Sequence, residues 1–216
     1  MPPAQPLRFE DRLVLNQWLL GLFRVSKFED LADKLKAPEL EGFDENNVTR
    51  FYHALCIYIH PERRRDLPDN QLLAYDENIV RHWKQITERR NRGGPFLYPK
   101  YFQHLALLFT EIYLDRYFRD PAGLLAELNA YVKIFNAKAR KASRIKPYTR
   151  QDLNKLAFWM ATGSGKTLLM HINILQYLHY LEVHERQREK DDPIELTLTL
   201  MYLQVVQVLE DIDVHE

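Results

Sequence analysis

The stretch LAFWMATGSGKTLLMHINIL, residues 156–175, decides how the C-terminal part of the chain is interpreted. Its centre, residues 161–167, matches the second half of the P-loop pattern, in which a glycine-rich turn is followed by Lys and then Ser or Thr. Glycine has no Cβ, so Gly163 and Gly165 let the backbone turn sharply and approach a polyphosphate closely. Backbone N–H groups that line such a turn form an anion-binding nest. These residues therefore predict a phosphate-binding loop.

Two side chains at the end of this loop suit a nucleotide with its metal ion. Lys166 is placed to bring its ammonium group to the β- and γ-phosphates. The Thr167 hydroxyl is placed to ligate Mg²⁺, which also needs phosphate oxygens. The helix expected after the loop adds its positive N-terminal end to the same site.

The sequence on either side fits this interpretation. The apolar run 156–160 predicts a short buried strand, and the almost wholly apolar run 168–183 predicts a helix packed into an α/β layer. One position departs from the full pattern, because Met160 stands where the first Gly is expected. The alternative is a chance Gly-Ser-Gly turn before a core helix. The agreement of strand, loop, Lys-Thr pair and helix favours the P-loop.

The run from Met160 to Thr167 resembles the ATP-binding motif of the superfamily-two, DEAD-like helicases, in which a larger residue commonly replaces the first Gly. Over residues 156–180 it is similar in particular to the Res subunit of type III restriction enzymes and to related helicase-like proteins. Those proteins are ATP-driven DNA translocases with two RecA-like domains. The resemblance implies that ATP and Mg²⁺ are the ligands of this loop. The residues expected to bind them are Thr162, Gly163, Ser164, Gly165, Lys166 and Thr167, with Thr167 nearest the metal.

The same resemblance suggests where the adenine would be bound. In helicases of this type a Gln shortly before the P-loop reads the base, and Gln151 is the candidate in this chain. Tyr148 is a second candidate, because its ring could stack on the adenine.

An ATPase of this class also needs an Asp that orders Mg²⁺ and an adjacent Glu that activates water. After the P-loop, Glu210 and Asp211 follow an apolar run, but in the reverse order, and we interpret them as part of a solvated end. Arginine fingers and a second RecA-like domain are not found either. We therefore assign no catalytic residue and leave ATP hydrolysis open. We expect a truncated or frameshifted front part of a longer motor, which binds ATP weakly and does not separate strands.

Three regions are expected along the chain. Residues 1–9 are rich in Pro and predict a disordered lead. In residues 10–146 apolar side chains recur at helical spacing, which predicts an all-helical domain of five or six helices. Residues 147–216 are expected to form a truncated P-loop module, with one more strand within 194–209. The predicted fold is thus mainly α, ending in the start of a RecA-like α/β module with an incomplete sheet.

The window 133–150 is basic and contains no acidic residue. Its cations are Lys133, Lys138, Arg140, Lys141, Arg144, Lys146 and Arg150. They suit contacts with DNA phosphates, or equally a solvated helix end followed by a linker. Both interpretations remain open at this stage.

Composition sets the broad class of protein. The chain has 216 residues, 46% hydrophobic, and a formal net charge of zero, so any surface for nucleic acid must be local. Cys56 is the single cysteine, which excludes a disulfide framework or a cysteine-rich zinc site. No apolar run approaches the roughly 20 residues of a membrane span, and the first residues lack a signal-peptide pattern. We expect a cytoplasmic protein without a membrane partner.

Two other functions fit the same sequence. In the first, the helical domain docks a methyltransferase subunit or another protein, and the P-loop is vestigial. In the second, the chain belongs to another class of P-loop ATPase, such as a signalling or AAA-like ATPase. The motif begins with Met160-Ala161-Thr162, which disfavours this other class of P-loop ATPase.

Overall fold

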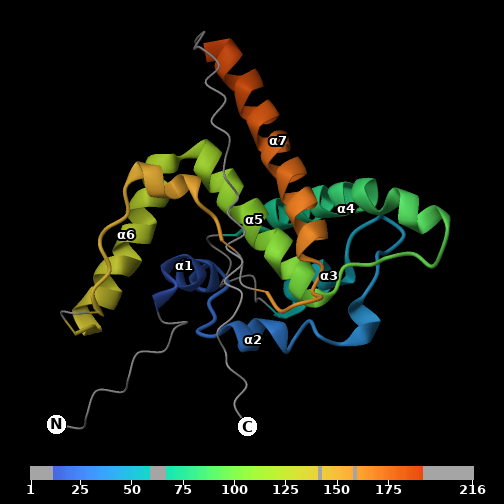
Figure 1. Ribbon diagram of the computed structural model, residues 1–216, viewed down its shortest axis with the longest axis horizontal. Helices are drawn as coiled ribbons and strands as arrows, with labels where there is room; N and C mark the ends of the chain where they lie inside the picture. Colours follow the sequence, from blue (N-terminus) through green and yellow to red (C-terminus); the bar gives the residue numbers. More distant parts are fainter. Residues whose placement is uncertain (1–11, 59–66, 141–142, 158–159, 192–216) are drawn as a thin grey trace.

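The computed structural model describes residues 12–58, 67–140, 143–157 and 160–191, with side chains up to residue 185 (Figure 1). The expected lead, the strand within 194–209 and the pair Glu210 and Asp211 lie outside these ranges. So do two residues, 158–159, of the strand expected before the loop.

The described part of the chain is mainly helical, as the sequence predicts. Its main helices are α1 (Val14–Leu22), α2 (Phe28–Ala32), α3 (Arg50–Tyr58), α4 (Asp69–Arg92), α5 (Tyr101–Arg119), α6 (Pro121–Lys138) and α7 (Lys166–Asp191). Two short 3₁₀ turns, η2 (Pro38–Leu40) and η5 (Arg150–Asn154), lie between them.

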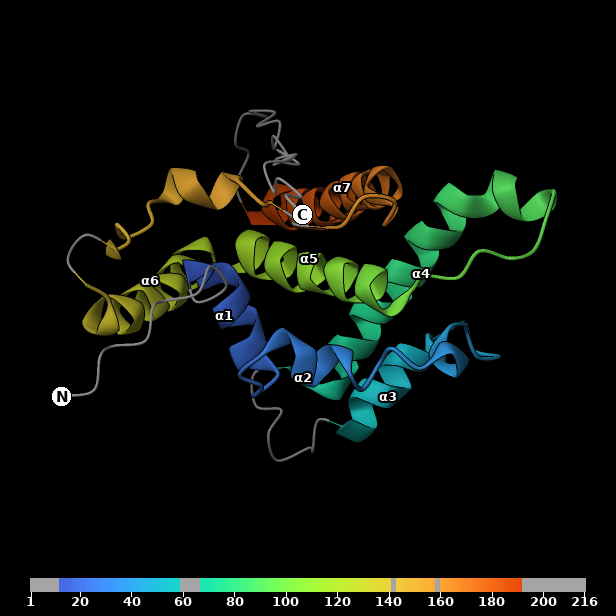
Figure 2. The same cartoon turned by 60° about the horizontal axis from the view of Figure 1, so that its bottom comes forward.

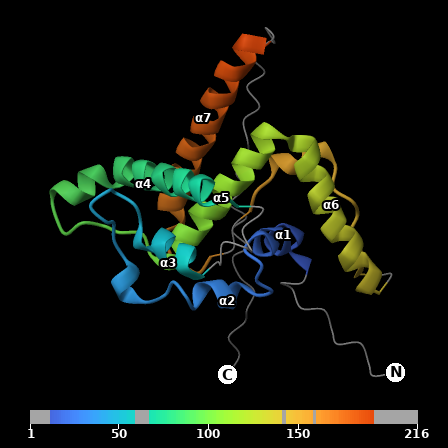
Figure 3. The ribbon, with the colours of Figure 1, turned by 180° about the vertical axis from the view of Figure 1, so that it is seen from behind.

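Helix α5 is the centre of the molecule. Apolar side chains are buried on all of its sides, as expected for a helix surrounded by others. It packs against α4, α6 and α7. Figures 1 and 3, which show opposite sides of the molecule, place α4 and α7 across its first half.

The P-loop helix α7 shares the hydrophobic core of the helices that precede it. Leu169, Ile172 and Tyr180 are buried in the same cluster as Trp83 of α4 and Leu108 of α5. Burial of this face fixes α7, and with it the loop at its start, on the α4–α5 pair.

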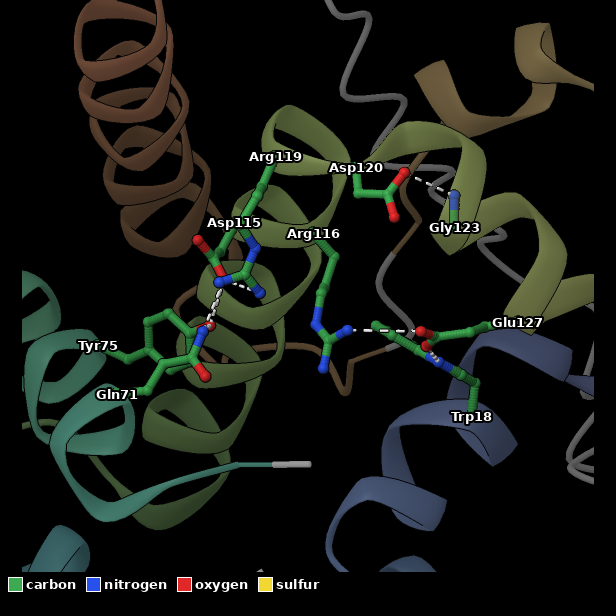
Figure 4. A network of polar contacts seen from close by, with 9 residues as sticks. All are labelled: Trp18, Gln71, Tyr75, Asp115, Arg116, Arg119, Asp120, Gly123 and Glu127. Atoms are coloured by element: carbon green, nitrogen blue, oxygen red, sulfur yellow. Dashed lines mark hydrogen bonds and ion pairs between the residues drawn. The ribbon is translucent and has the colours of Figure 1, made fainter. Parts of the chain in front are cut away.

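The junction between α5 and α6 is set by a local signal in the sequence. Asp120 precedes Pro121, the first residue of α6, and its carboxylate accepts a hydrogen bond from Gly123 N at 2.8 Å (Figure 4). An N-cap followed by Pro at the first helical position is a typical helix start. The Trp18 indole of α1 donates to Glu127 of α6 at 2.8 Å and fastens α1 to the same end.

Polar side chains also join α4 to α5. Tyr75 Oη and Gln71 Nε2 both donate to Asp115 Oδ2, at 2.7 and 2.8 Å, and Arg119 lies 3.1 Å from the same oxygen (Figure 4). Each acceptor site of this carboxylate oxygen is thereby used where α4 meets α5.

The start of a RecA-like sheet is not confirmed. In the described ranges the chain forms no β-strand, and only Phe43 and Thr49 make an isolated antiparallel bridge. Leu156, Ala157 and Met160, the described residues of the expected strand, lie outside any strand. A parallel strand needs neighbouring strands to pair with, and the described residues form none.

Among the helices described, none combines the length and the apolar character that crossing a lipid bilayer requires.

Candidate nucleotide-binding loop

The backbone of the motif forms a tight loop directly before α7. Gly163 and Gly165 have φ angles of +78° and +85°, in the left-handed region that favours glycine. Ser164 N donates to Ala161 O at 3.2 Å and closes a turn, and Leu169 N donates to Gly165 O at 3.0 Å as the first helical hydrogen bond. The two predicted glycines therefore occupy the two positions of the loop whose backbone is left-handed.

Helix α7 begins at Lys166, so the loop ends on a helix N-terminus. The N–H groups of Lys166, Thr167 and Leu168 have no partner within the helix, because the helical bonds start at Leu169. The first turn contains no acidic residue, so the positive end of the helix dipole is not neutralised locally. This arrangement suits an anion.

The outer side of the loop is open. A Cβ added to Gly163 would meet no heavy atom within 4 Å. Thr162, Gly163 and Thr167 are exposed, and Ser164, Gly165 and Lys166 are half-buried. The structure thus brings together all six residues predicted to bind the phosphates and Mg²⁺, with room on one side for a ligand.

The inner side of the loop rests on α5. Gln103, in the first turn of α5, donates from Nε2 to Ser164 O at 2.8 Å. Its Oε1 accepts from Lys100 N at 2.9 Å, which fixes the orientation of the amide. The sequence did not point to Gln103. Its only signal was a polar residue on a helix whose neighbours are mostly apolar.

Helix α7 is held further along by a buried carboxyl group. Glu111 of α5 is 0% exposed and accepts from Tyr180 Oη at 2.6 Å, from Gln176 Nε2 at 2.8 Å and from Asn78 Nδ2 at 3.2 Å. Burial raises the pKa of Glu111 to about 7, although the three hydrogen bonds favour the ionised form. One carboxyl group therefore joins α4, α5 and α7.

The two candidates for binding adenine lie away from the loop. Tyr148 is clasped to α6, where Asn129 accepts from its N–H at 2.8 Å and donates to its C=O at 3.1 Å. Gln151 is exposed in η5. The end of η5 contacts α5 through Tyr113, which donates to Leu153 O at 2.6 Å.

The position of η5 along α5 explains this separation. Tyr113 and Gln103 lie roughly 15 Å apart along the helix axis, and the loop is fastened at Gln103. Figures 1 and 2 both show η5 beside α6, whereas α7 begins beside the start of α5. The structure therefore does not bring Gln151 or Tyr148 to the phosphate loop.

The basic window forms an ordered edge on α6. Asn136 donates to Ile145 O at 2.8 Å and accepts from Ile145 N at 2.9 Å, so the segment 143–150 is held along α6 at Asn136 and Asn129. The cations described there are all exposed: Lys133, Lys138, Arg140, Arg144, Lys146 and Arg150. None of them is paired with an acidic residue of the described ranges.

A second polar cluster belongs to the core. His104 Nε2 lies 2.8 Å from Asp76 Oδ1, and Thr49 donates to both oxygens of Asp76, from Oγ1 at 2.6 Å and from N at 2.7 Å. All three residues are at most 1% exposed, so a substrate has no access to them. Asp76 and Thr49 both face Nε2 of His104, and the burial of all three gives them a structural role. The described residues include no group of acidic, His and Cys side chains that could hold a metal ion.

Comparison with known proteins finds no family model, no curated protein and no solved structure that matches the chain.

Proposed function

We propose that residues 162–167 bind the triphosphate of ATP together with Mg²⁺, and that the chain is the ATP-binding N-terminal part of a DNA helicase or restriction-type translocase. The observation that carries the proposal is the pair of left-handed glycines directly before the first turn of α7. The free N–H groups of that turn would bind phosphate oxygens. Lys166 would neutralise the β- and γ-phosphates, and Thr167 would ligate Mg²⁺ through its hydroxyl.

The outer face of α7 supports the finer assignment to a RecA-like module. Ile174 and Leu178, one helical turn apart, are 44% and 50% exposed, whereas Ile172 on the other face is fully buried. Parallel sheets are covered by helices on both faces. A helix with one apolar face on α4 and α5 and another that is uncovered suits a position between the helical unit and a sheet.

The direct test is a titration with ATP and Mg²⁺, comparing the unmodified chain with Lys166→Ala. Loss of the ammonium group should weaken binding by about tenfold or more, because a charge-assisted hydrogen bond to phosphate contributes on the order of 1.5–3 kcal/mol. The matched control is Lys155→Ala, which removes the same charge from an exposed site before the loop. Equal affinity of the unmodified chain and Lys166→Ala would refute the assignment.

For DNA, we propose the basic edge on α6 as the surface that contacts phosphates. Its exposed cations have no acidic partner among the described residues, and the two asparagine contacts hold the backbone of residues 145–148 along α6. The double substitution Arg144→Glu and Lys146→Glu should weaken binding of a short duplex by about tenfold at low salt and should reduce the salt dependence. ATP affinity should stay unchanged, since these residues lie in the segment 143–150, which is held along α6 away from the loop. Unchanged DNA affinity, measured by fluorescence anisotropy, would remove this surface from the proposal.

A further inference from the structure

The phosphate loop is fastened to the helical unit by one amide side chain. Gln103 is 8% exposed, and its two polar atoms are both used: Oε1 accepts from Lys100 N, and Nε2 donates to Ser164 O. Lys100, which orients this amide, also forms an ion pair with Glu41 at 2.6 Å. The loop is therefore connected to residues far from it in the sequence.

This contact determines the direction of the next N–H group. A trans peptide is planar, and its C=O and N–H point to opposite sides. The described chain contains no cis peptide bond. Because Ser164 C=O points to Gln103, the N–H of Gly165 points away from α5, toward the open side of the loop.

The same contact explains why a glycine follows Ser164. A Cβ added to Gly165 would lie 2.7 Å from Gln103 Nε2, closer than side chains tolerate. At Gly163 the corresponding space is empty, although its φ is similar. A side chain at position 165 would thus be strained by the backbone conformation and would also displace the Gln103 amide from Ser164 O.

We propose that Gln103 is a positioning residue of the nucleotide site: it holds the Ser164 peptide so that the N–H of Gly165 faces the phosphates, and it thereby makes nucleotide affinity dependent on the helical unit. This inference rests on the proposed ATP binding. It adds that a residue of α5, outside the motif, sets the geometry of the loop, and that a change in α5 or in its contact with Lys100 alters affinity for the triphosphate.

The test uses a substitution that can regain the missing donor. In Gln103→Glu the ionised carboxylate still accepts from Lys100 N, but it cannot donate to Ser164 O. When the carboxyl group is protonated it can donate again, and burial raises the pKa of such a group into an accessible range. At pH 8 the variant should bind ATP and Mg²⁺ about tenfold more weakly than the unmodified chain. The ratio of the two affinities should approach one as the pH falls to about 5.5. Protonation of ATP affects binding to both proteins equally, so its effect cancels in this ratio.

Two further variants separate positioning from general stability. Gln103→Met has a similar size but no donor, so it should bind weakly at every pH. Gln71→Met removes a hydrogen-bonding amide of α4, whose partners are Tyr75 and Asp115. It should lower the thermal midpoint but leave ATP affinity unchanged, as it is remote from the loop. Hydrogen exchange of the loop amides without ligand should be faster in Gln103→Met than in the unmodified chain.

The outcomes distinguish the two proposals. If the unmodified chain binds no ATP, the proposed function fails, and the exchange rates still show whether Gln103 fixes the loop. If the unmodified chain binds ATP and Gln103→Glu binds it equally well at pH 8, the positioning role is overturned. A weakening in Gln103→Glu that does not recover at low pH would overturn it as well.

Discussion

At the scale of single residues, the polar side chains on the buried faces of α5 and α7 decide how the loop is held. Gln103 reaches the loop backbone, and Glu111 reaches the middle of α7. Both are buried, Gln103 at 8% and Glu111 at 0% exposed, where an unpaired polar group would be costly. Each side chain therefore holds its partner in place. The role of each can be tested by exchanging its amide for a carboxyl group or the reverse.

The raised pKa of Glu111 predicts that the free energy of unfolding depends on pH. Burial raises this pKa from 4.5 to about 7, so the folded state favours the protonated form. This contribution is fully present below pH 4.5 and is lost as the pH rises through 7. Between pH 5 and pH 8 the free energy of unfolding should fall by up to about 3 kcal/mol on account of this group.

Urea denaturation of the unmodified chain and of Glu111→Gln at several pH values measures this effect. The amide does not titrate, so the difference between the two curves isolates the carboxyl group. His82, whose pKa burial lowers to about 4, gives the opposite slope in both proteins and cancels. A difference that is constant with pH would show that Glu111 is ionised in the folded state throughout.

At the scale of elements, α7 has two apolar faces with different surroundings. Ile172 is fully buried against α4 and α5, and Leu178 is 50% exposed. The sequence predicts a helix that is apolar almost all round, but periodicity cannot say which face is covered. That depends on the packing of α5, which the sequence places far from α7.

Because the two faces differ in burial, shortening a side chain to Ala should lower the free energy of unfolding by different amounts on each face. Ile172→Ala should lower the free energy of unfolding by about 2–5 kcal/mol, because it leaves a cavity in the core. Leu178→Ala should change it by less than about 0.5 kcal/mol, as expected for a surface position. Thermal unfolding of both variants provides the measurement. A large cost at Leu178 would mean that this face is covered in solution.

Two aspartates show that a local sequence signal marks the start of a helix in one case and not in the other. Asp120 caps the start of α6, directly before Pro121. Asp44 is also a residue type favoured at helix starts, but its Oδ1 accepts from the N–H groups of Asn46 and Val48, both at 2.9 Å, and caps a turn. Helix α3 begins later, at Arg50. A side chain of this kind satisfies turns and helices equally well.

At the scale of the whole molecule, the sequence predicted the helical character of the described chain and the location of the glycine loop. It could not predict that the loop would rest on α5, because Gln103 and Ser164 are 61 positions apart and no local pattern links them. The expected sheet is not confirmed, since a strand is defined by its partners rather than by its own composition. The apolar run at 156–160 carried no information about those partners.

The central claim is that the loop before α7 binds a triphosphate through its backbone. It is tested most directly by following the backbone amide resonances of isotope-labelled protein while ATP and Mg²⁺ are added. The N–H signals of Gly165, Lys166 and Thr167 should shift most, because these groups lie at the open start of the helix. Unchanged signals at these residues, or changes confined to other parts of the chain, would contradict the account.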